Sequence, residues 1–389
     1  MIKHVTDSIY YVGVDDKDID LFENQYVVPN GMAYNSYVID DEKIVIMDMV
    51  DVKCAEEWYA NLDEVLKGRQ PDYLVMSHLE PDHSANLTEV LKRYPELKVV
   101  SNAKLLAMVP NFFPDIDLTG RTITVDGSEL FDTGVHKLNF VMAPMVHWPE
   151  VMVTYEQSEK LLFSADGFGK FSALDVEEDW ACEARRYYFN IVGKYGAQVQ
   201  ALLKKAAALD IKMILPLHGP ILKEDLGYYL GLYNTWSSYQ PESKGVFVAY
   251  ASIHGNTAKA AEKLGEMLKE KGAEKVVISD LSRSDMAENI EDAFKYDRIV
   301  LMASSYDGGV FPVMEDFLMH LKSKNYQNRK IGLVENGSWA PTAARVMKGY
   351  VENFKNVTIA EPVVTIRSTL NEASEKALGE LAEVMAKGE

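Results

Sequence analysis

Apolar runs and amphipathic segments alternate regularly in the C-terminal part of the chain. Five apolar runs have the length of β-strands, and the segments between them place apolar residues at helical spacing. The predicted strands are 246–250, 276–278, 298–302, 331–334 and 362–366, and the predicted helices lie near 258–271, 286–295, 312–324, 341–354 and 371–387. Strands that alternate with helices in this way predict an α/β fold with a doubly wound parallel sheet.

The pattern before residue 240 is of another kind. Short strands come first, and a mixture of hairpins and helices follows them. The predicted strands are 9–12, 34–39, 43–47 and 73–76, the hairpins lie near 121–140 and 151–164, and the helices lie near 176–191 and 195–209. This mixed order predicts an α+β arrangement of layers. The short polar stretch 240–245 is predicted to be a turn-forming linker, so we expect two domains, 1–240 and 246–389.

Composition and charge exclude several classes of partner. The chain has 389 residues, of which 47% are hydrophobic and 25% are charged, which is typical of a globular protein. The formal net charge of -19 argues against nucleic-acid binding, because neutralising phosphates needs a basic surface. No apolar run approaches the ~20 residues that span a bilayer, and the first residues lack the apolar core of a signal peptide. We therefore expect neither a nucleic-acid partner nor a membrane partner.

The cysteine content limits the redox chemistry of the chain. Cys54 and Cys182 are the two cysteines of the sequence, and they form no Cys-x-x-Cys pair. The sequence therefore encodes neither a disulfide framework nor a cysteine-ligated iron centre. A reducing compartment suits such a protein, so we expect a cytoplasmic location.

The most concentrated chemistry lies in one hexapeptide, His78-Leu79-Glu80-Pro81-Asp82-His83. It follows the apolar run 73–76 directly, and it carries four side chains of metal-ligand type. Because side chains alternate along an extended chain, His78, Glu80 and Asp82 are expected to point the same way. This hexapeptide therefore predicts a metal site at the end of a strand.

Three further ligand candidates also stand near the ends of predicted strands. His147 and His218 each follow an apolar run, and Asp166 precedes a glycine. Each of them alone would be explained as a packed or turn residue, but together they repeat one pattern. Seven donors exceed what one ion needs, so we predict two adjacent metals. A set rich in carboxylates and without cysteine favours iron or manganese over structural zinc, and Asp166 could bridge ions ~3.5–4 Å apart.

A second candidate site lies in the C-terminal domain. A strand, a loop of small and hydroxyl residues and a helix N-terminus together form a cradle for phosphate. In a doubly wound sheet the ligand sits at the carboxyl ends of the strands, where three loops meet and where aromatic rings could stack on a flat cofactor. The expected cofactor-binding residues are Ser252, Ile253, His254, Gly255, Asn256, Thr257, Ser304, Ser305, Tyr306, Asp307, Gly308, Gly309, Asn336, Gly337, Ser338 and Trp339.

These motifs resemble those of the flavodiiron proteins, and the two-domain layout matches that family over essentially the whole chain. The resemblance implies a metallo-β-lactamase-like αββα sandwich with two irons, followed by a flavodoxin-like domain with FMN. Carried over by position, His78, Glu80 and His147 would bind one iron, and Asp82, His83 and His218 would bind the other. Asp166 would bridge the two irons. Hydrolytic relatives of the first domain usually carry histidine where Glu80 stands.

The resemblance also implies an activity and partners. The family reduces dioxygen to water, nitric oxide to nitrous oxide, or both. It takes electrons from a separate donor, usually rubredoxin and in some members a reduced deazaflavin, and it forms head-to-tail homodimers or dimers of dimers. Two alternatives stay open: a zinc hydrolase fused to a flavodoxin, and a non-enzymatic gas or redox sensor.

Overall fold

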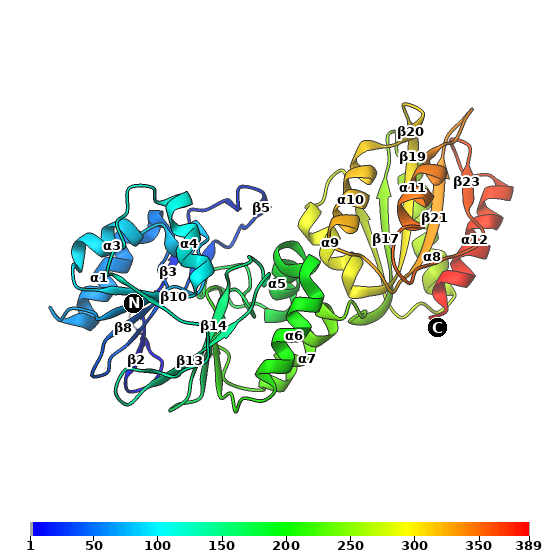
Figure 1. Ribbon diagram of the computed structural model, residues 1–389. Coiled ribbons are helices and arrows are strands. Elements are labelled where there is room, and N and C mark those ends of the chain that lie inside the picture. Colours follow the sequence, from blue (N-terminus) through cyan, green and yellow to red (C-terminus); the bar gives the residue numbers. More distant parts are fainter. Residues whose placement is uncertain (1–2, 389) are drawn as a thin grey trace. The chain divides into compact units, whose positions relative to one another are not determined.

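The computed structural model describes residues 3–388, which form two compact units (Figure 1). The first unit takes the chain up to Tyr188 and again over Ala197–Tyr233. The second unit takes Phe189–Gly196 and the chain from Asn234 onward. The short segment Phe189–Gly196 therefore belongs to the second unit, and the chain re-enters the first unit at Ala197.

The stretch 240–245, expected to be a linker, is only partly irregular. Strand β17 (Ser243–Ala251) begins inside it. The first residue of this strand pairs with Tyr296 of the neighbouring strand, and the backbone N–H of Gly245 donates to the Asp297 carboxylate at 2.8 Å. The prediction of a linker over the whole stretch is therefore wrong, because backbone and side-chain partners on the adjacent strand extend β17 into it.

Two larger sheets form the centre of the first unit, as far as residues 3–388 describe it. One has the strand order β1-β2-β7-β8-β9-β10-β11, and the other has the order β12-β13-β14-β15-β16. The first sheet comprises β1 (Lys3–His4), β2 (Ile9–Tyr11), β7 (Tyr37–Ile39), β8 (Val45–Met47), β9 (Tyr73–Val75), β10 (Lys98–Ser101) and β11 (Thr122–Thr124). The second comprises β12 (Phe131–Asp132), β13 (Lys137–Met142), β14 (Met152–Glu156), β15 (Leu161–Phe163) and β16 (Met213–Leu215).

The two sheets pack against each other through an apolar core. In β13, for example, Leu138 and Phe140 are buried while Lys137 and Asn139 are less so, which is the alternation of a strand with one face inward. The core joins residues of both sheets, namely Ile9, Tyr11, Tyr37, Ile39, Val45, Met47, Val75, Val100, Leu138, Phe140, Met152, Leu161, Phe163 and Leu215.

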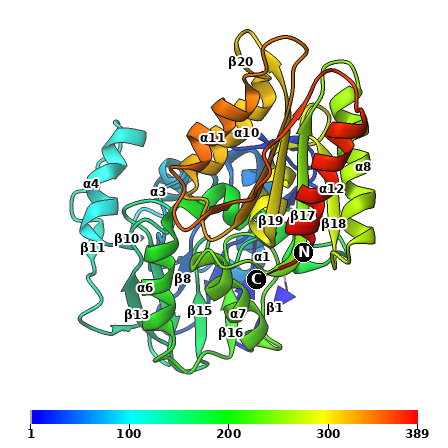
Figure 2. The same ribbon diagram turned by 90° about the vertical axis from the view of Figure 1, so that its right-hand side faces the viewer.

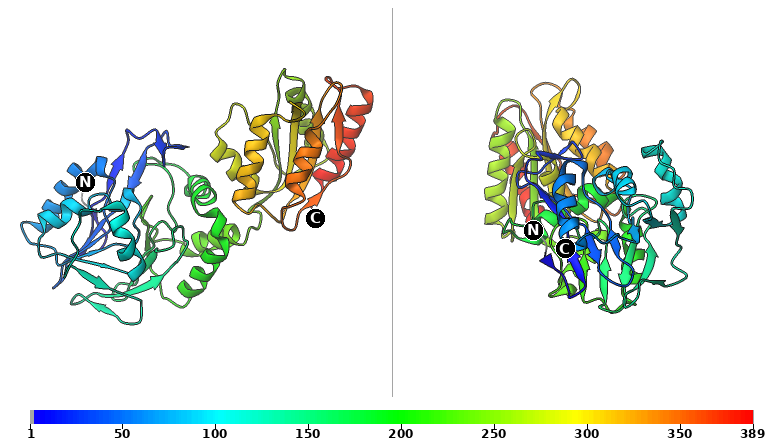
Figure 3. Two further views of the ribbon diagram at one scale, coloured as in Figure 1. Left: turned by 45° about the horizontal axis from the view of Figure 1, so that its top comes forward. Right: turned by 90° about the vertical axis from the view of Figure 1, so that its left-hand side faces the viewer.

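Helices flank this pair of sheets on both sides. The helices drawn in blue and cyan lie on one side and the green helices lie on the other (Figure 3). They are α1 (Ala55–Leu66), α3 (Leu87–Arg93), α4 (Ala103–Phe112), α5 (Trp180–Tyr187), α6 (Gly196–Ala206) and α7 (Leu226–Ser237). The unit is thus an αββα sandwich, as expected, although no helix was predicted from the sequence at the positions of α1, α3, α4 and α7.

The predicted strand 34–39 is broken in two. Strand β6 (Met32–Tyr34) lies in a small separate sheet, and β7 belongs to the large one. Between them the Asn35 side chain donates to the backbone carbonyls of Pro216 and Gly219, at 2.8 Å each. A buried amide satisfied in this way fixes an irregular break at residues 35–36, so a continuous strand does not form.

The predicted hairpin 121–140 is also corrected by the structure. Strand β11 pairs in parallel with β10 in the first sheet, while β12 and β13 form an antiparallel pair in the second. The chain crosses between the sheets at Gly127, whose φ is 84°, and a Cβ there would collide with the Phe140 carbonyl oxygen. The hairpin predicted at 151–164 is confirmed as β14 and β15.

The second unit is a parallel sheet covered by helices on both faces. Its strands run in the order β18-β17-β19-β21, with β22 and β23 both beside β21 and β20 beside β19. Beyond β17 they are β18 (Val276–Asp280), β19 (Tyr296–Tyr306), β20 (Gly309–Val310), β21 (Lys330–Asn336), β22 (Thr358–Ile359) and β23 (Val364–Ile366). All pairs except β19 with β20 are parallel. Strand order therefore reverses between β17 and β19, which makes this the switch point for a ligand.

The helices of the second unit lie close to their predicted positions. Figure 2 shows α8 and α12 on one side of the sheet and α10 and α11 on the other. The helices are α8 (Asn256–Glu270), α9 (Met286–Lys295), α10 (Pro312–Ser323), α11 (Ala343–Val351) and α12 (Glu372–Ala386). Local capping fixes their starts: the Asp285 carboxylate accepts from the Ala287 N–H, and Asn371 with Ser374 forms a capping box. Among residues 3–388, no helix has both the length and the apolar character needed to cross a membrane.

Candidate metal centre and cofactor pocket

The hexapeptide 78–83 does not stay extended as predicted. Strand β9 ends at Val75, and Pro81–Ser84 forms a short helical turn, α2, with Pro81 at its first position. Proline favours this position because its φ is preset and the first helical N–H needs no partner. The turn separates His78 and Glu80 from Asp82 and His83, so the two pairs face different partners. The expectation that alternation would point His78, Glu80 and Asp82 the same way therefore holds for His78 and Glu80 and is wrong for Asp82.

The seven predicted ligands come together from loops at strand ends of both sheets. His78 and its neighbours follow β9 of the first sheet, whereas Asp166 follows β15 and His218 follows β16 of the second. His147 lies between β13 and β14. Strands β9 and β15 each run parallel to a neighbour, which brings the carboxyl ends of these strands to one edge of each sheet. The site therefore occupies one edge of the sandwich.

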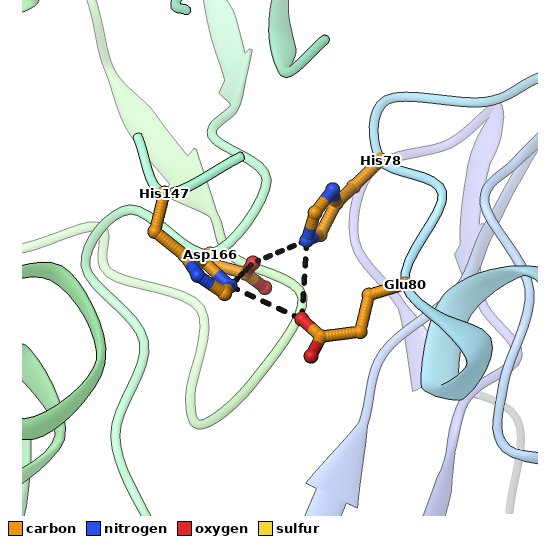
Figure 4. A group of neighbouring side chains, drawn as sticks. All are labelled: His78, Glu80, His147 and Asp166. Carbon is orange, nitrogen blue, oxygen red and sulfur yellow. Dashed lines mark hydrogen bonds and ion pairs between the residues drawn. The ribbon is translucent and has the colours of Figure 1, made fainter. Parts of the chain in front are cut away.

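Four of these side chains form a first group (Figure 4). The Glu80 Oε2 atom lies 3.1 Å from the Nε2 atoms of both His78 and His147. The Asp166 Oδ2 atom lies 3.4 Å from His78 Nε2 and 3.3 Å from His147 Nε2. Two imidazoles and two carboxylates thus direct one donor atom each to a common centre.

A second group adjoins the first through the same aspartate. The Asp82 Oδ2 atom lies 3.3 Å from the Nε2 atoms of His83 and His218. The other oxygen of Asp166, Oδ1, lies 3.3 Å from His83 Nε2 and 3.6 Å from His218 Nε2. Asp166 therefore turns one oxygen toward each group, which is the geometry of a bridging carboxylate.

The chemistry of both groups fits metal ions. Asp82 and Asp166 are buried, and none of their carboxylate oxygens accepts a hydrogen bond among the described residues. The His83 and His218 Nε2 atoms face each other at 3.1 Å. Buried carboxylates without donors are costly unless a cation compensates them. The donor set, all oxygen and imidazole nitrogen, suits iron.

The electrostatics of the cluster also favour a cation. Burial alone would lower the pKa of His83, but the Asp82 and Asp166 carboxylates outweigh burial and raise that pKa to about 9. Burial likewise would lower the pKa of His147, which Asp166 and Glu80 raise to about 9. Burial would raise the pKa of Asp166, but the His147 and His78 rings hold it well below its usual value. The raised pKa values of the two histidines and the lowered pKa of Asp166 all favour positive charge at the centre.

Residues around the ligands hold the imidazoles in orientation. The His78 Nδ1 atom lies 2.8 Å from Oε1 of the buried Glu150, which also accepts the Leu79 N–H at 3.1 Å. The His218 Nδ1 atom lies 2.8 Å from the carbonyl oxygen of Ala33. Such contacts turn the Nε2 atoms toward the metal. Glu150 was not predicted from the sequence, because it follows Trp148-Pro149 in a loop without a periodic pattern.

The three predicted cofactor loops of the second unit also come together, around a pocket of about 580 Å³. All sixteen predicted residues line it except Gly255 and Gly309. Ala340, the last residue of the third predicted loop, 336–340, also lines the pocket. Sequence reasoning missed Thr342 and Ser368, which line the pocket too and which carried no motif of their own. The pocket lies beyond the carboxyl ends of β17, β19 and β21, at the switch point of the sheet.

Hydroxyl and amide side chains tie the pocket's loops together. Helix α8 begins at Asn256 with Gly255 as its cap, two residues earlier than predicted. The buried Thr257 hydroxyl lies 3.0 Å from the Ser304 hydroxyl and accepts from the Asn336 amide at 3.3 Å. The loop before α8 can therefore present backbone N–H groups and the positive end of the helix dipole to a phosphate.

The two aromatic residues of the pocket are open to solvent. Tyr306 is 45% exposed and Trp339 is 89% exposed. Tyr306 packs edge-on against Phe311, with ring centroids 5.7 Å apart, whereas no ring contact involves Trp339 among the described residues. Trp339 therefore has little role in the packing of the protein, and its ring is available to a flat ligand.

Two family models match the chain. The model of the ODP family beta lactamase matches residues 32–219, and a flavodoxin domain model matches residues 247–362. Over 382 residues the chain is 31% identical to a nitric oxide reductase of Moorella thermoacetica, and the match covers 93% of this chain and 92% of that protein.

Two solved structures share the fold over nearly the whole chain. The rubredoxin oxygen:oxidoreductase of Desulfovibrio gigas matches with a TM-score of 0.92 at 23% identity, covering 99% of this chain and 98% of that chain. The flavodiiron protein of Giardia intestinalis matches with a TM-score of 0.89 at 22% identity, covering 99% of this chain and 96% of that chain. The predicted fold, a metallo-β-lactamase-like sandwich followed by a flavodoxin-like domain, is confirmed.

Replacing the shared aspartate should empty the metal centre. We expect Asp166→Asn to lower the metal content from two ions per chain to one or none, because the amide loses the charge that faces both groups. The flavin should stay bound. Elemental analysis and flavin absorbance on one sample measure both, with the exposed carboxylate variant Asp115→Asn as control. Full metal content in Asp166→Asn would show that this residue is no ligand.

Glu150 should act on the metal through His78. We expect Glu150→Gln to weaken metal binding by about 10- to 100-fold, the usual effect of removing such a partner. A competition titration against a chelator measures the affinity, and the exposed Glu129→Gln is the matched control. Equal affinity in the two variants would mean that the Glu150 contact does not orient His78.

Trp339 should matter to the flavin and not to the fold. Because its ring is exposed, Trp339→Ala should leave the melting temperature unchanged, yet remove ~0.5–1.5 kcal/mol of stacking, up to about tenfold in flavin affinity. Fluorescence recovery on flavin release gives the dissociation constant, with Met319→Ala, another exposed residue of the same unit, as control. A dissociation constant equal to that of the control would place Trp339 away from the flavin.

Proposed function

The chain belongs to the flavodiiron protein family, and on that premise we propose that it reduces dioxygen to water, nitric oxide to nitrous oxide, or both. It is an oxidoreductase that uses FMN and a non-haem diiron pair. The observation that best supports the proposal is Asp166, whose two oxygens face two separate groups of ligand-type side chains.

We assign one iron to each of the two groups of side chains described above. His78, Glu80 and His147 hold one iron, and Asp82, His83 and His218 hold the other, with Asp166 between the two. When bound, the flavin would supply electrons one at a time, and the iron pair would supply redox equivalents to a diatomic substrate. Glu150 and the Ala33 carbonyl keep the imidazoles of His78 and His218 turned toward the metals. Burial of the carboxylates keeps water from competing for these positions.

The flavin site is assigned to the second unit in the same way. The loop at Ser252–Thr257 takes the phosphate, and the Ser304–Gly309 and Asn336–Trp339 loops flank the ring. We divide the chain by function into a diiron domain, 1–240, and an FMN domain, 246–389. This division follows the two compact units apart from the short segment Phe189–Gly196 and the residues next to the boundary.

The electron donor is proposed to be a separate molecule, with rubredoxin as first choice and a reduced deazaflavin as second. A head-to-tail homodimer or a dimer of dimers is the proposed assembly, because it would bring the flavin of one chain to the diiron site of another. The cytoplasm is the proposed compartment, in keeping with a sequence that has two cysteines, Cys54 and Cys182, and no Cys-x-x-Cys pair.

The rival functions are supported less well. A zinc hydrolase would share the fold of the first domain, but the carboxylate of Glu80 stands where such enzymes usually carry histidine. A pure sensor would bind the gas without consuming it. Substrate consumption separates these possibilities directly.

A test can follow the electrons from flavin to gas. Protein loaded with FMN and iron is reduced anaerobically and mixed with dioxygen or nitric oxide, and protein loaded with FMN and zinc is the matched control. We expect the iron form to reoxidise rapidly and to yield water or nitrous oxide, because four electrons reduce dioxygen to two waters and two electrons reduce two nitric oxide molecules to nitrous oxide and water. The zinc form should yield hydrogen peroxide from dioxygen by slow flavin oxidation. Identical rates and products in the iron and zinc forms would contradict the proposal.

A further inference from the structure

A small cavity lies in the first unit, between helix α6 and the five-stranded sheet. Its free volume is about 20 Å³, compared with the roughly 10–15 Å³ that one water-sized molecule needs. The cavity is lined by Val141, Val146, Val153, Leu162, Ser164, Gly167, Phe168, Val199, Leu202, Leu203, Ala206, Leu209 and Tyr233. It can therefore hold one small molecule, and eleven of its thirteen lining residues are apolar or glycine.

The two polar side chains of the lining are already engaged. The Ser164 hydroxyl donates to the Gly167 carbonyl at 2.6 Å. The Tyr233 hydroxyl accepts the Phe168 N–H at 2.5 Å, and the two rings stack with centroids 4.1 Å apart. A water molecule needs two to four polar partners, so this cavity stays dry. A dry apolar cavity takes apolar guests instead.

The cavity shares its wall with the metal centre. Ser164, Gly167 and Phe168 line it, and Asp166 lies among them in the chain with its carboxylate turned to the histidines. Val146 lines it as well and directly precedes His147. The loop that presents the bridging carboxylate on one side thus forms the wall of the cavity on the other.

We propose that this cavity binds one molecule of the gaseous substrate, an apolar diatomic, and holds it beside the diiron centre. This inference rests on the proposed function, since it concerns the path of the same gas. Dioxygen and nitric oxide are small, weakly polar and poorly solvated by water, which is the chemistry that a dry apolar cavity selects. Water, thiols and charged solutes are excluded from it on the same ground.

A gas molecule held there is captured close to the metals, so filling the cavity should slow capture of the gas. Slower capture lowers kcat/KM and raises KM for the gas, while kcat stays unchanged because the groups that hold the metals are untouched. A ligand or bridging residue would behave differently, since its loss lowers kcat.

Xenon is the probe for occupancy, because it binds dry apolar cavities and takes no part in turnover. Crystals pressurised with xenon should show one atom between Val153 and Ala206, in protein with or without iron and flavin. If the protein consumes the gas but no xenon binds in this cavity, the inference is wrong and the proposed function stands. A protein that binds xenon there but consumes neither gas would overturn the proposed function.

Filling the cavity tests its role in catalysis. Ala206→Phe adds a ring from α6, and Val153→Leu adds one methylene from the opposite wall with less risk to folding. The matched control is Ala207→Phe, at the exposed neighbouring position. Both filled variants should lose xenon and show KM for the gas raised by about three- to tenfold at normal kcat, metal and flavin content. Loss of xenon with KM equal to that of the control would contradict the proposal.

Discussion

The burial of charge at one edge of the sandwich is the constraint on which the structure depends. Asp82, Asp166 and four imidazoles are withdrawn from water, and Glu80 joins them from a half-buried position. Unpaired carboxylates in such a place would cost several kcal/mol each. Two metal ions, one in each group, would compensate the three carboxylates, and Asp166 is the residue that faces both. The fold must therefore hold the Asp166 carboxylate in a fixed position between the two groups.

That place is fixed by backbone geometry on both sheets. Asp166 follows the buried strand β15, which pairs in parallel with β16, and β16 in turn ends just before His218. The loop of His218 is held by the side chain of Asn35 and by the Ala33 carbonyl, which come from the other side of the sandwich. The first sheet delivers His78 and Glu80 from the end of β9. Ligands on short loops after buried strands keep their positions because the strands cannot shift without exposing the core.

Much of this could be predicted from the sequence, and what could not has physical causes. Ligand-type residues after apolar runs identified all seven members of the two groups, since buried strands leave a clear signal. Alternation alone did not separate Asp82 from His78 and Glu80, because Pro81 starts a helical turn where a strand was predicted. The split into two groups followed only from the family resemblance. Glu150 was missed because a loop residue that acts on a histidine leaves no pattern. Helix α7 was missed because its aromatic residues and two glycines give no clear apolar face. The break between β6 and β7 at Asn35 depends on carbonyls more than 180 residues away.

The central claim is that two irons lie on either side of Asp166. Anomalous diffraction from crystals of the iron-loaded protein, recorded above and below the iron absorption edge, tests it most directly. We predict two iron peaks about 3.5–4 Å apart, one beside His78, Glu80 and His147 and the other beside Asp82, His83 and His218, with the Asp166 carboxylate between them. A single peak, or peaks present only at the zinc edge, would contradict the account.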